Sequence, residues 1–277
     1  MRAVMFVGAA VALSACTFET KLPAGSSEPD ANEVGGEGEQ STGVAACKTP
    51  DASGLVVCLE FEDSVSDGVL DDSSPARRNA QSTGFSQIAR DGSGASMAAD
   101  VGPMASTYVQ DVAPFNLAGA YTLAAWVKPD TLPPNNSARG VLDHEGQYAM
   151  IVSTTAAGAI NNRCQHTGVA KYEYTERLPV GQWSFMACTW DGTQLCAWRW
   201  ASATDRERFC HTPTFSPAAA GTAGLAVGHL SSSGTAHSRF DGALDSVQVY
   251  ARGMTEAQLC ALAGQAPGCM PCNAGCI

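Results

Sequence analysis

One acidic residue, Asp245, stands among apolar neighbours near the end of the chain. Residues 240–250 read as a single strand, and strict alternation places Asp245 on the same face as Val247 and Val249. Two valines on one face indicate a core. Asp245 must therefore find a cation, a hydrogen-bond donor or the rim of the sheet, because a bare buried carboxylate is costly.

The chain has eleven cysteines, which indicates an oxidising compartment. Cys188 and Cys196 lie symmetrically about Gly192 in a predicted Asp-Gly hairpin, so we expect them to face each other and form a disulfide. Two further pairings are expected: Cys47 with Cys58, and Cys164 with Cys210. Four cysteines form a C-terminal cluster: Cys260, Cys269, Cys272 and Cys276. That cluster could bind zinc, but export and the lack of nearby histidine favour disulfides.

The N-terminus has the features of an export signal. A positive start, Met1-Arg2, precedes an apolar run over residues 3–13 that is too short for a comfortable membrane span. Residues 13–16, Leu-Ser-Ala-Cys, resemble the lipobox of bacterial lipoproteins, in which cleavage leaves Cys16 at the new N-terminus for acylation. Thr17 follows instead of Asp, which in a Gram-negative cell implies the outer membrane. The alternative is a plain secretory cleavage site.

Composition divides the rest of the chain into three parts. Residues 16–46 are rich in Gly, Ser, Pro and Glu, which predicts a disordered acidic tether with a reach on the order of 30 Å. Residues 47–264 suit one domain, and residues 265–277 form a Cys-rich tail. The net charge of −11, with no stripe of Lys or Arg, excludes nucleic-acid binding.

Short strands separated by turn residues recur through the domain. We expect strands at residues 54–63, 121–129, 140–142, 148–152, 181–190, 193–200, 224–228 and 240–250. Only one helix is predicted, and Thr255 can cap it. This pattern predicts an all-β sandwich.

Four stretches resemble the laminin G-like domains in order and spacing. They are the opening strand with its Asp-Ser-Ser turn (residues 54–74), Trp-Val-Lys-Pro at residues 126–129, the Gly-Gln-Trp strand and hairpin (residues 181–200), and the closing strand with its helix (residues 240–262). The resemblance covers residues 54–264. It implies the concanavalin A-like lectin/glucanase jelly roll, a sandwich of two antiparallel sheets with one short C-terminal helix. We expect the first and final segments of the domain, residues 55–61 and 244–250, to lie side by side within it. The sequence departs from the family at Trp200-Ala201-Ser202, where the family usually turns through Asp-Gly, and in its many cysteines.

The resemblance also implies a Ca²⁺ site, because this family often holds the ion at one edge of the sandwich. The matching positions are Glu62 and Asp245, with Asp72 as a third ligand and Asp63 as an alternative to Glu62. Oxygen ligands from separate strands suit the flexible coordination of Ca²⁺.

Five tryptophans offer rings on which a sugar could stack. Four match core positions of the family: Trp126, Trp183, Trp190 and Trp198. Trp200 lies past the usual strand end, so it is the candidate for an exposed platform.

Catalysis is not expected. Glu60 and Glu62 share a strand face, as the paired carboxylates of glucanases with this fold do. However, they lie on the opening strand instead of a strand in mid-sequence, and the third acidic residue of that motif is missing. Asp143-His144-Glu145 could bind a metal, but we expect these residues in a solvated turn.

The sequence therefore predicts a lipid-anchored, exported, non-enzymatic module at the cell surface that recognises carbohydrate or another extracellular surface. Protein–protein adhesion, or a structural role in the envelope, is the main alternative, and glycoside hydrolysis is a weaker one. Contact with the membrane is expected through the lipid anchor only.

Overall fold

The computed structural model describes residues 47–49, 51–63, 67–92, 96–110, 113–144, 146–158, 160–166, 170–175, 178–202, 205–212, 224–232 and 235–264 of the chain. All of them belong to one compact unit. The expected signal peptide, the acylated Cys16, the tether and the Cys-rich tail lie outside the described residues.

Strands make up most of the secondary structure in the described part of the chain. They are β1 (Leu55–Leu59), β2 (Val69–Leu70), β3 (Ala80–Ala89), β4 (Met97–Val109), β5 (Tyr121–Pro129), β6 (Ala138–His144), β7 (Tyr148–Thr154), β8 (Ile160–His166), β9 (Ala170–Thr175), β10 (Ser184–Trp190), β11 (Leu195–Trp200), β12 (Arg206–His211), β13 (Leu225–Val227), β14 (Leu230–Ser232), β15 (Thr235–His237) and β16 (Gly242–Tyr250). A short 3-10 helix covers Ala113–Phe115, and the helix α1 covers Glu256–Ala263.

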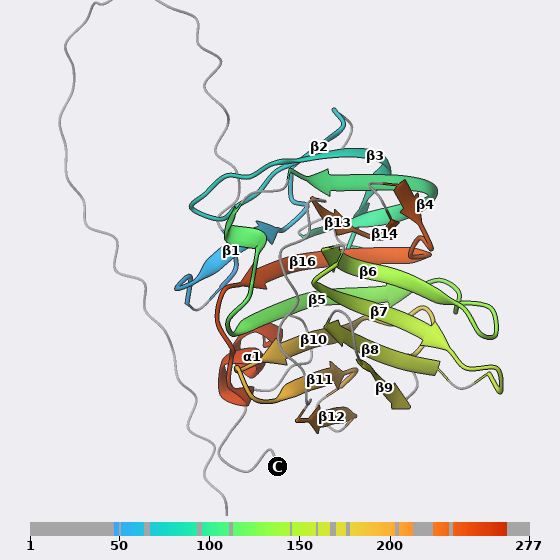
Figure 1. Ribbon diagram of the computed structural model, residues 1–277. Coiled ribbons are helices and arrows are strands. Elements are labelled where there is room, and N and C mark those ends of the chain that lie inside the picture. The colour runs from blue at the N-terminus through green and yellow to red at the C-terminus, as the bar shows by residue number, and fades with distance from the viewer. Residues whose placement is uncertain are drawn as a thin grey trace, which may run out of the picture. The chain divides into compact units, whose positions relative to one another are not determined.

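The strands form an antiparallel sheet that curls into two layers, as the family resemblance predicted (Figure 1). The strand order is β12-β11-β10-β5-β16-β4-β13-β6-β7-β8-β9, with β1 paired to β16 and β3 paired to β4. One layer holds β12, β11, β10, β5 and β16 with β1, and the other holds β13, β6, β7, β8 and β9 (Figure 1). The first and last strands lie side by side, with Leu55 opposite Tyr250 and Leu59 opposite Val247.

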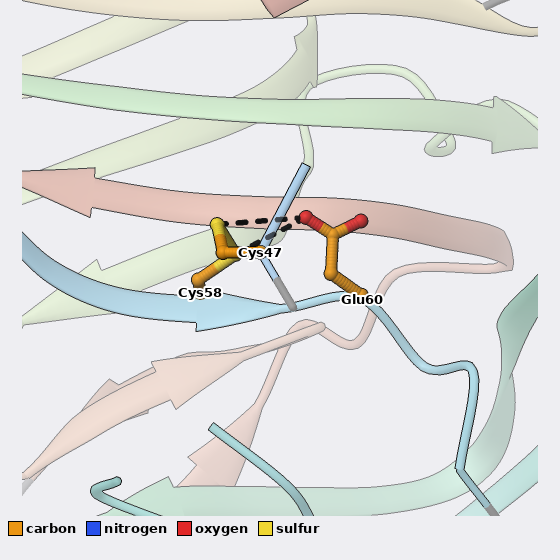
Figure 2. Close-up of side chains that lie close together, drawn as sticks. All are labelled: Cys47, Cys58 and Glu60. Carbon is orange, nitrogen blue, oxygen red and sulfur yellow. Dashed lines mark hydrogen bonds between the residues drawn. A yellow bond between two sulfur atoms is a disulfide. The ribbon is translucent and has the colours of Figure 1, made fainter. Parts of the chain in front are cut away.

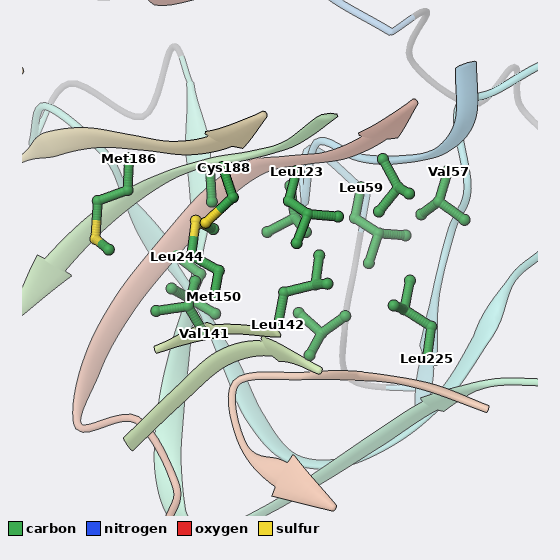
Figure 3. Close-up of a cluster of buried hydrophobic side chains, with 14 of the residues drawn as sticks. Val57, Leu59, Leu123, Val141, Leu142, Met150, Met186, Cys188, Leu225 and Leu244 are labelled. Atoms are coloured by element: carbon green, nitrogen blue, oxygen red, sulfur yellow. The ribbon is translucent and has the colours of Figure 1, made fainter. Parts of the chain in front are cut away.

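Apolar side chains from both layers fill the space between them (Figure 3). Leu123 of β5 and Leu244 of β16 come from one layer, while Leu142 of β6 and Met150 of β7 come from the other. All four are fully buried. This core holds the layers together, and it leaves the outer face of the β1–β16–β5–β10 layer free to carry other side chains.

A β-bulge in β16 corrects the predicted position of Asp245. Asp245 pairs with Trp126 and Gln248 with Ala124, so two residues, Ser246 and Val247, oppose one residue of β5. Ser246 has a φ of 46°, the left-handed conformation that such a bulge requires. The extra residue reverses the alternation: Val247 points into the core, whereas Asp245 points to the outer face. The prediction that they share a face was wrong.

The hairpin of β10 and β11 corrects the predicted disulfide between Cys188 and Cys196. Cys188 lies opposite Ala197, and Cys196 lies opposite Thr189, so the register differs by one residue from the symmetric arrangement. A shift of one residue places the two cysteines on opposite faces of the sheet. Cys188 instead bonds to Cys164 in the other layer, and Cys196 bonds to Cys210, its direct neighbour on β12.

The remaining expectations for cysteines have different outcomes. Cys47 and Cys58 are bonded, as predicted. The expected pair of Cys164 with Cys210 is wrong, because each has the partner given above. Cys260 is also disulfide-bonded. The other members of its predicted cluster lie outside the described residues.

Helix α1 covers part of the outer face. Thr255 caps it as predicted, and Gln258 completes a capping box, so an amide takes the place of the usual acid. Leu259 and Leu262 of the helix join an outer apolar cluster with Tyr250 and Trp198. Among the described residues, no helix has the length and apolar character needed to cross a bilayer.

Candidate functional site

Three carboxylates meet on the outer face of the β1–β16 pair, and we call Glu60, Glu62 and Asp245 the acidic cluster. Glu60 and Glu62 come just after β1, and Asp245 lies at the bulge of β16. Ser246 connects two of them, because its amide donates to Asp245 (2.7 Å) and its hydroxyl donates to Glu60 (2.8 Å).

Arg90 neutralises Asp245. Its guanidinium forms an ion pair with the carboxylate, and the two side chains are 9% and 0% exposed. The same guanidinium lies between two indole rings, with its Cζ 4.9 Å from the centroid of Trp126 and 5.0 Å from that of Trp183. Burial raises the pKa of Asp245 to about 7, while Arg90 acts in the opposite direction.

Glu62 is held by Lys48, which precedes β1, and by residues at the start of β4. Lys48 forms an ion pair with one carboxylate oxygen, and the Ser96 hydroxyl donates to the same oxygen (3.1 Å). The amide of Met97 donates to the other oxygen (3.0 Å). The second acidic side chain therefore also has a cation beside it.

Glu60 is 1% exposed and lies against the disulfide of Cys47 and Cys58 (Figure 2). Its neutral donors are the Lys48 amide (3.0 Å), the Ser246 hydroxyl and the Gln248 side chain (3.4 Å). Burial raises the pKa of Glu60 above its ordinary value, and the hydrogen bonds lower it by less.

Asp72, the third predicted calcium ligand, organises a loop. Its carboxylate accepts hydrogen bonds from the amides of Cys58 (2.8 Å), Ser74 (2.9 Å) and Arg78 (2.7 Å), and from the Ser74 hydroxyl (2.6 Å). Four donors use the lone pairs of both oxygens. This network explains how the Asp-Ser-Ser turn holds its shape.

As arranged, the predicted ligands do not form an open set of oxygens for Ca²⁺. Lys48 already pairs with Glu62 and Arg90 with Asp245, and both oxygens of Asp72 already accept hydrogen bonds.

Calcium binding stays a prediction. A bound ion would stabilise the fold by mass action, so EDTA should lower the Tm of the wild-type domain and have no effect on Asp245→Asn. Identical melting curves in EDTA and in excess Ca²⁺ would contradict it.

Trp200 is not the exposed platform that the sequence predicted. It is 4% exposed, and its ring stacks on Phe185 (centroids 5.2 Å apart) and meets Trp198 edge-on (6.1 Å). Residues of α1 belong to the same cluster. Trp200 is therefore part of the outer apolar cluster, and its role is packing.

Trp183, which the sequence analysis assigned to the core, is the tryptophan that keeps part of its surface open. The other four are all buried. Trp183 lies immediately before β10, its indole nitrogen donates to the carbonyl of Arg90 (3.1 Å), and Lys128 Nζ lies 5.9 Å from the ring centroid. Its position before a strand, after the Gly181-Gln182 turn, was the only available signal in the sequence.

Polar side chains continue from Trp183 across the outer face. Lys128 of β5 pairs with Ala243 of β16, Ala243 with Asp100 of β4, and Asp100 with Ser86 of β3. Residues directly opposite each other share a face. Burial and nearby acidic groups raise the pKa of Asp100. We call Ser86, Asp100, Lys128 and Trp183 the polar row.

Asp143 and His144 do not lie in a solvated turn. Both belong to β6, where Asp143 accepts from the Ser231 amide (2.8 Å) and His144 is fully buried against Tyr148. Successive strand residues point to opposite faces, so these two cannot share one metal ion. Glu145 lies outside the described residues.

The comparisons with known proteins agree with the fold. A family model described as the concanavalin A-like lectin/glucanases superfamily matches residues 103–260. None of the curated proteins matches the chain.

Several solved structures are similar at low identity. Domain 4 of AbnA, a GH43 extracellular arabinanase from Geobacillus stearothermophilus, in complex with arabinotriose, has 18% identity and a TM-score of 0.55, over 76% of this chain and 98% of that chain. The binding domain of Paraclostridial Mosquitocidal Protein 1 has 13% identity and a TM-score of 0.54, over 74% and 51%. Trypanosoma rangeli sialidase in complex with sialic acid has 15% identity and a TM-score of 0.52, over 77% and 33%. At these identities the likeness shows the fold alone.

The matched region spans more than half of the sequence, and the curled antiparallel sheet has the expected architecture. The chain therefore belongs to the concanavalin A-like lectin/glucanase superfamily, as its laminin G-like landmarks predicted.

Proposed function

We propose that this domain is a carbohydrate-binding module and that the sugar binds at the polar row, with its C–H face against Trp183. The observation that carries the proposal is the partial exposure of Trp183, which packs against the edge of the outer apolar cluster, whereas the other four tryptophans are buried. Ligand sites of this kind combine an apolar ring with a few polar groups that fix orientation. Lys128 and Asp100 supply a donor and an acceptor on the same face.

The similar structures support the same class of ligand. The arabinanase domain that was solved with arabinotriose has this fold over 98% of its chain, and a sialidase solved with sialic acid has it over 33% of its chain. The fold hosts many roles, so the assignment depends on the site and not on the likeness.

Binding without hydrolysis is part of the proposal. The paired acids that could catalyse glycoside cleavage are Glu60, which is buried beneath a disulfide, and Glu62, which is paired with Lys48. A substrate would have to displace both arrangements. Release of reducing ends from a bound glycan would contradict this part.

A glycan array followed by calorimetry on the best ligand tests the site. We expect Trp183→Ala to weaken binding by about 30-fold, the effect of truncating a central aromatic. Because Trp183 also contacts Arg90, Lys128→Ala provides a second variant at a half-buried position, and it should weaken binding while the domain stays folded. Phe209→Ala on β12, which removes an exposed ring outside the polar row, is the matched control.

Two results would overturn the proposal. One is an array on which no glycan binds, which would favour recognition of a protein surface. The other is unchanged affinity in both Trp183→Ala and Lys128→Ala.

Export and membrane attachment complete the proposed role. The three disulfides among the described residues support an oxidising compartment. Lipid attachment at Cys16 in the outer membrane is supported by the lipobox-like residues 13–16. A Cys16→Ser variant should leave the membrane fraction, and its retention there would contradict the anchor.

A further inference from the structure

The Cys47–Cys58 disulfide differs from the other two disulfides between described cysteines in having a carboxylate beside both sulfur atoms. Oε1 of Glu60 lies 3.1 Å from Sγ of Cys58 and 3.7 Å from Sγ of Cys47 (Figure 2). Disulfide sulfurs carry no hydrogen, so these are contacts and not hydrogen bonds while the bond is intact. Among the described residues, this is the one group of three His, Cys, Asp or Glu side chains whose ligand atoms lie within 4.8 Å of one another.

The other disulfides provide an internal comparison. Sγ of Cys164 contacts two backbone carbonyls at 3.8 Å, and Sγ of Cys196 contacts the side-chain carbonyl of Gln194 at 3.8 Å. Neither contact offers an anionic oxygen. In the part of the chain that the structure describes, the combination of two sulfurs and a carboxylate therefore occurs at the start of the domain alone.

These positions match the ligand spacing of a tetrahedral zinc site. With a Zn–S distance of about 2.3 Å and a Zn–O distance of about 2.1 Å, a sulfur and an oxygen on one ion are about 3.6 Å apart. The contact of Glu60 with Cys47 (3.7 Å) is close to that value, and its contact with Cys58 (3.1 Å) is shorter. The sulfurs themselves would need about 3.8 Å between them, so the bond between them must be broken before both can bind one ion.

We propose that reduction of the Cys47–Cys58 disulfide creates a binding site for a thiophilic divalent cation such as Zn²⁺, with Cys47, Cys58 and Glu60 as protein ligands. A dithiol reductant gives two electrons and two protons to the disulfide and becomes a disulfide itself. The two protein thiols then lose their protons when the cation binds, and a water molecule completes the coordination.

The surroundings of Glu60 fit this role. Its donors, the Lys48 amide, the Ser246 hydroxyl and the Gln248 side chain, are all neutral. The Lys48 amide and the Gln248 side chain share Oε1, the oxygen that faces the sulfurs, so a cation bound there would displace the longer contact, from Gln248 (3.4 Å). They orient the carboxylate toward the sulfurs. Ligands held in this way bind metal more tightly than free ones.

The approach of the reductant follows from burial. Cys47 is half-buried, whereas Cys58 is fully buried. A thiolate therefore attacks Sγ of Cys47, and Sγ of Cys58 is the leaving group.

Titration of the reduced full chain with Cd²⁺, a spectroscopic substitute for Zn²⁺, tests the proposal. Reduction with a phosphine, which is then removed under nitrogen, opens the other disulfides as well. We therefore expect sulfur-to-cadmium charge-transfer absorption that exceeds the absorption of Cys47→Ser by about one bound equivalent. Cys47→Ser should lose this component. Glu60→Gln should keep the two thiolates but bind at least about tenfold more weakly. The oxidised chain should show none of it.

The double variant Cys196→Ser/Cys210→Ser is the matched control, because it removes a disulfide without a nearby carboxylate, and it should retain the signal. Equal Cd²⁺ absorption in wild type and Cys47→Ser would overturn the proposal. So would a reduced domain that loses its near-ultraviolet circular dichroism and does not regain it when Cd²⁺ or Zn²⁺ is added.

Discussion

Replacement of Arg90 by alanine should lower the free energy of unfolding by about 3–5 kcal/mol, the usual cost of leaving one partner of a buried ion pair alone. Asp245 has no exposed surface, and its carboxylate would lose the cation that it contacts. The substitution also removes the guanidinium between Trp126 and Trp183. Chemical denaturation followed by tryptophan fluorescence measures the change.

The loss of stability in Arg90→Ala should increase as the pH rises. Burial already raises the pKa of Asp245 from 3.8 to about 7, and removal of Arg90 raises it further. A carboxyl whose pKa is higher in the folded state binds more protons when folded, so stability falls as pH rises through that pKa. The deficit of Arg90→Ala relative to wild type should therefore be larger at about pH 8 than at about pH 5.

Two further variants isolate the ion pair. Asp245→Asn in the Arg90→Ala background removes the stranded charge, so it should restore part of the stability and abolish the added pH dependence. Arg208→Ala removes an arginine from a pair whose side chains are 55% and 38% exposed, and it should cost less than about 1 kcal/mol. Equal losses for Arg90→Ala and Arg208→Ala would contradict the burial argument.

Trp200→Ala should also destabilise the domain by about 3–5 kcal/mol, the range for truncating a buried aromatic ring. The ring stacks on Phe185 and lies beside Trp198, so its removal leaves a cavity in the outer apolar cluster. The midpoint of urea denaturation measures the loss.

The same variant separates packing from recognition. At a temperature where Trp200→Ala is fully folded, its affinity for a bound glycan should equal that of the wild type, whereas Trp183→Ala should bind weakly. A Trp200→Ala variant with wild-type stability and reduced glycan binding would restore Trp200 as a binding residue.

The architecture was accessible from sequence because its signals are local and repeated. Alternating apolar residues in short runs predict strands, and the laminin G-like landmarks fix their order. The pairing of β1 with β16 followed from that order, and the structure confirms it with Leu59 opposite Val247. Thr255 as the start of α1 was equally local, because a cap depends on residues within one turn.

The site was less accessible, because single-residue shifts decide which face a side chain occupies. The left-handed Ser246 adds one residue to β16 and moves Asp245 out of the core. The β10–β11 turn places Cys188 opposite Ala197 instead of Cys196. Neither Ser246 nor Gly192 shows by its residue type that the register will shift.

Exposure of the tryptophans depended on tertiary packing. Trp200 is covered by a cluster that includes α1, a helix more than fifty residues later in the chain. Trp183 keeps part of its surface open because it stands before β10 and not within it. Neither property has a signature in the residues adjacent to these rings.

The Cys47–Cys58 bond also determines how the domain would bear mechanical load. A pull that arrives along the chain before Cys47 crosses the sulfur bridge and enters β1 at Cys58, opposite Gln248 of β16, instead of peeling the strand from Leu55. The force is then shared by the ladder between the first and last strands. Cleavage of the bridge would lengthen the chain that carries the load by eleven residues. The force would then act on β1 at its N-terminal residue, Leu55.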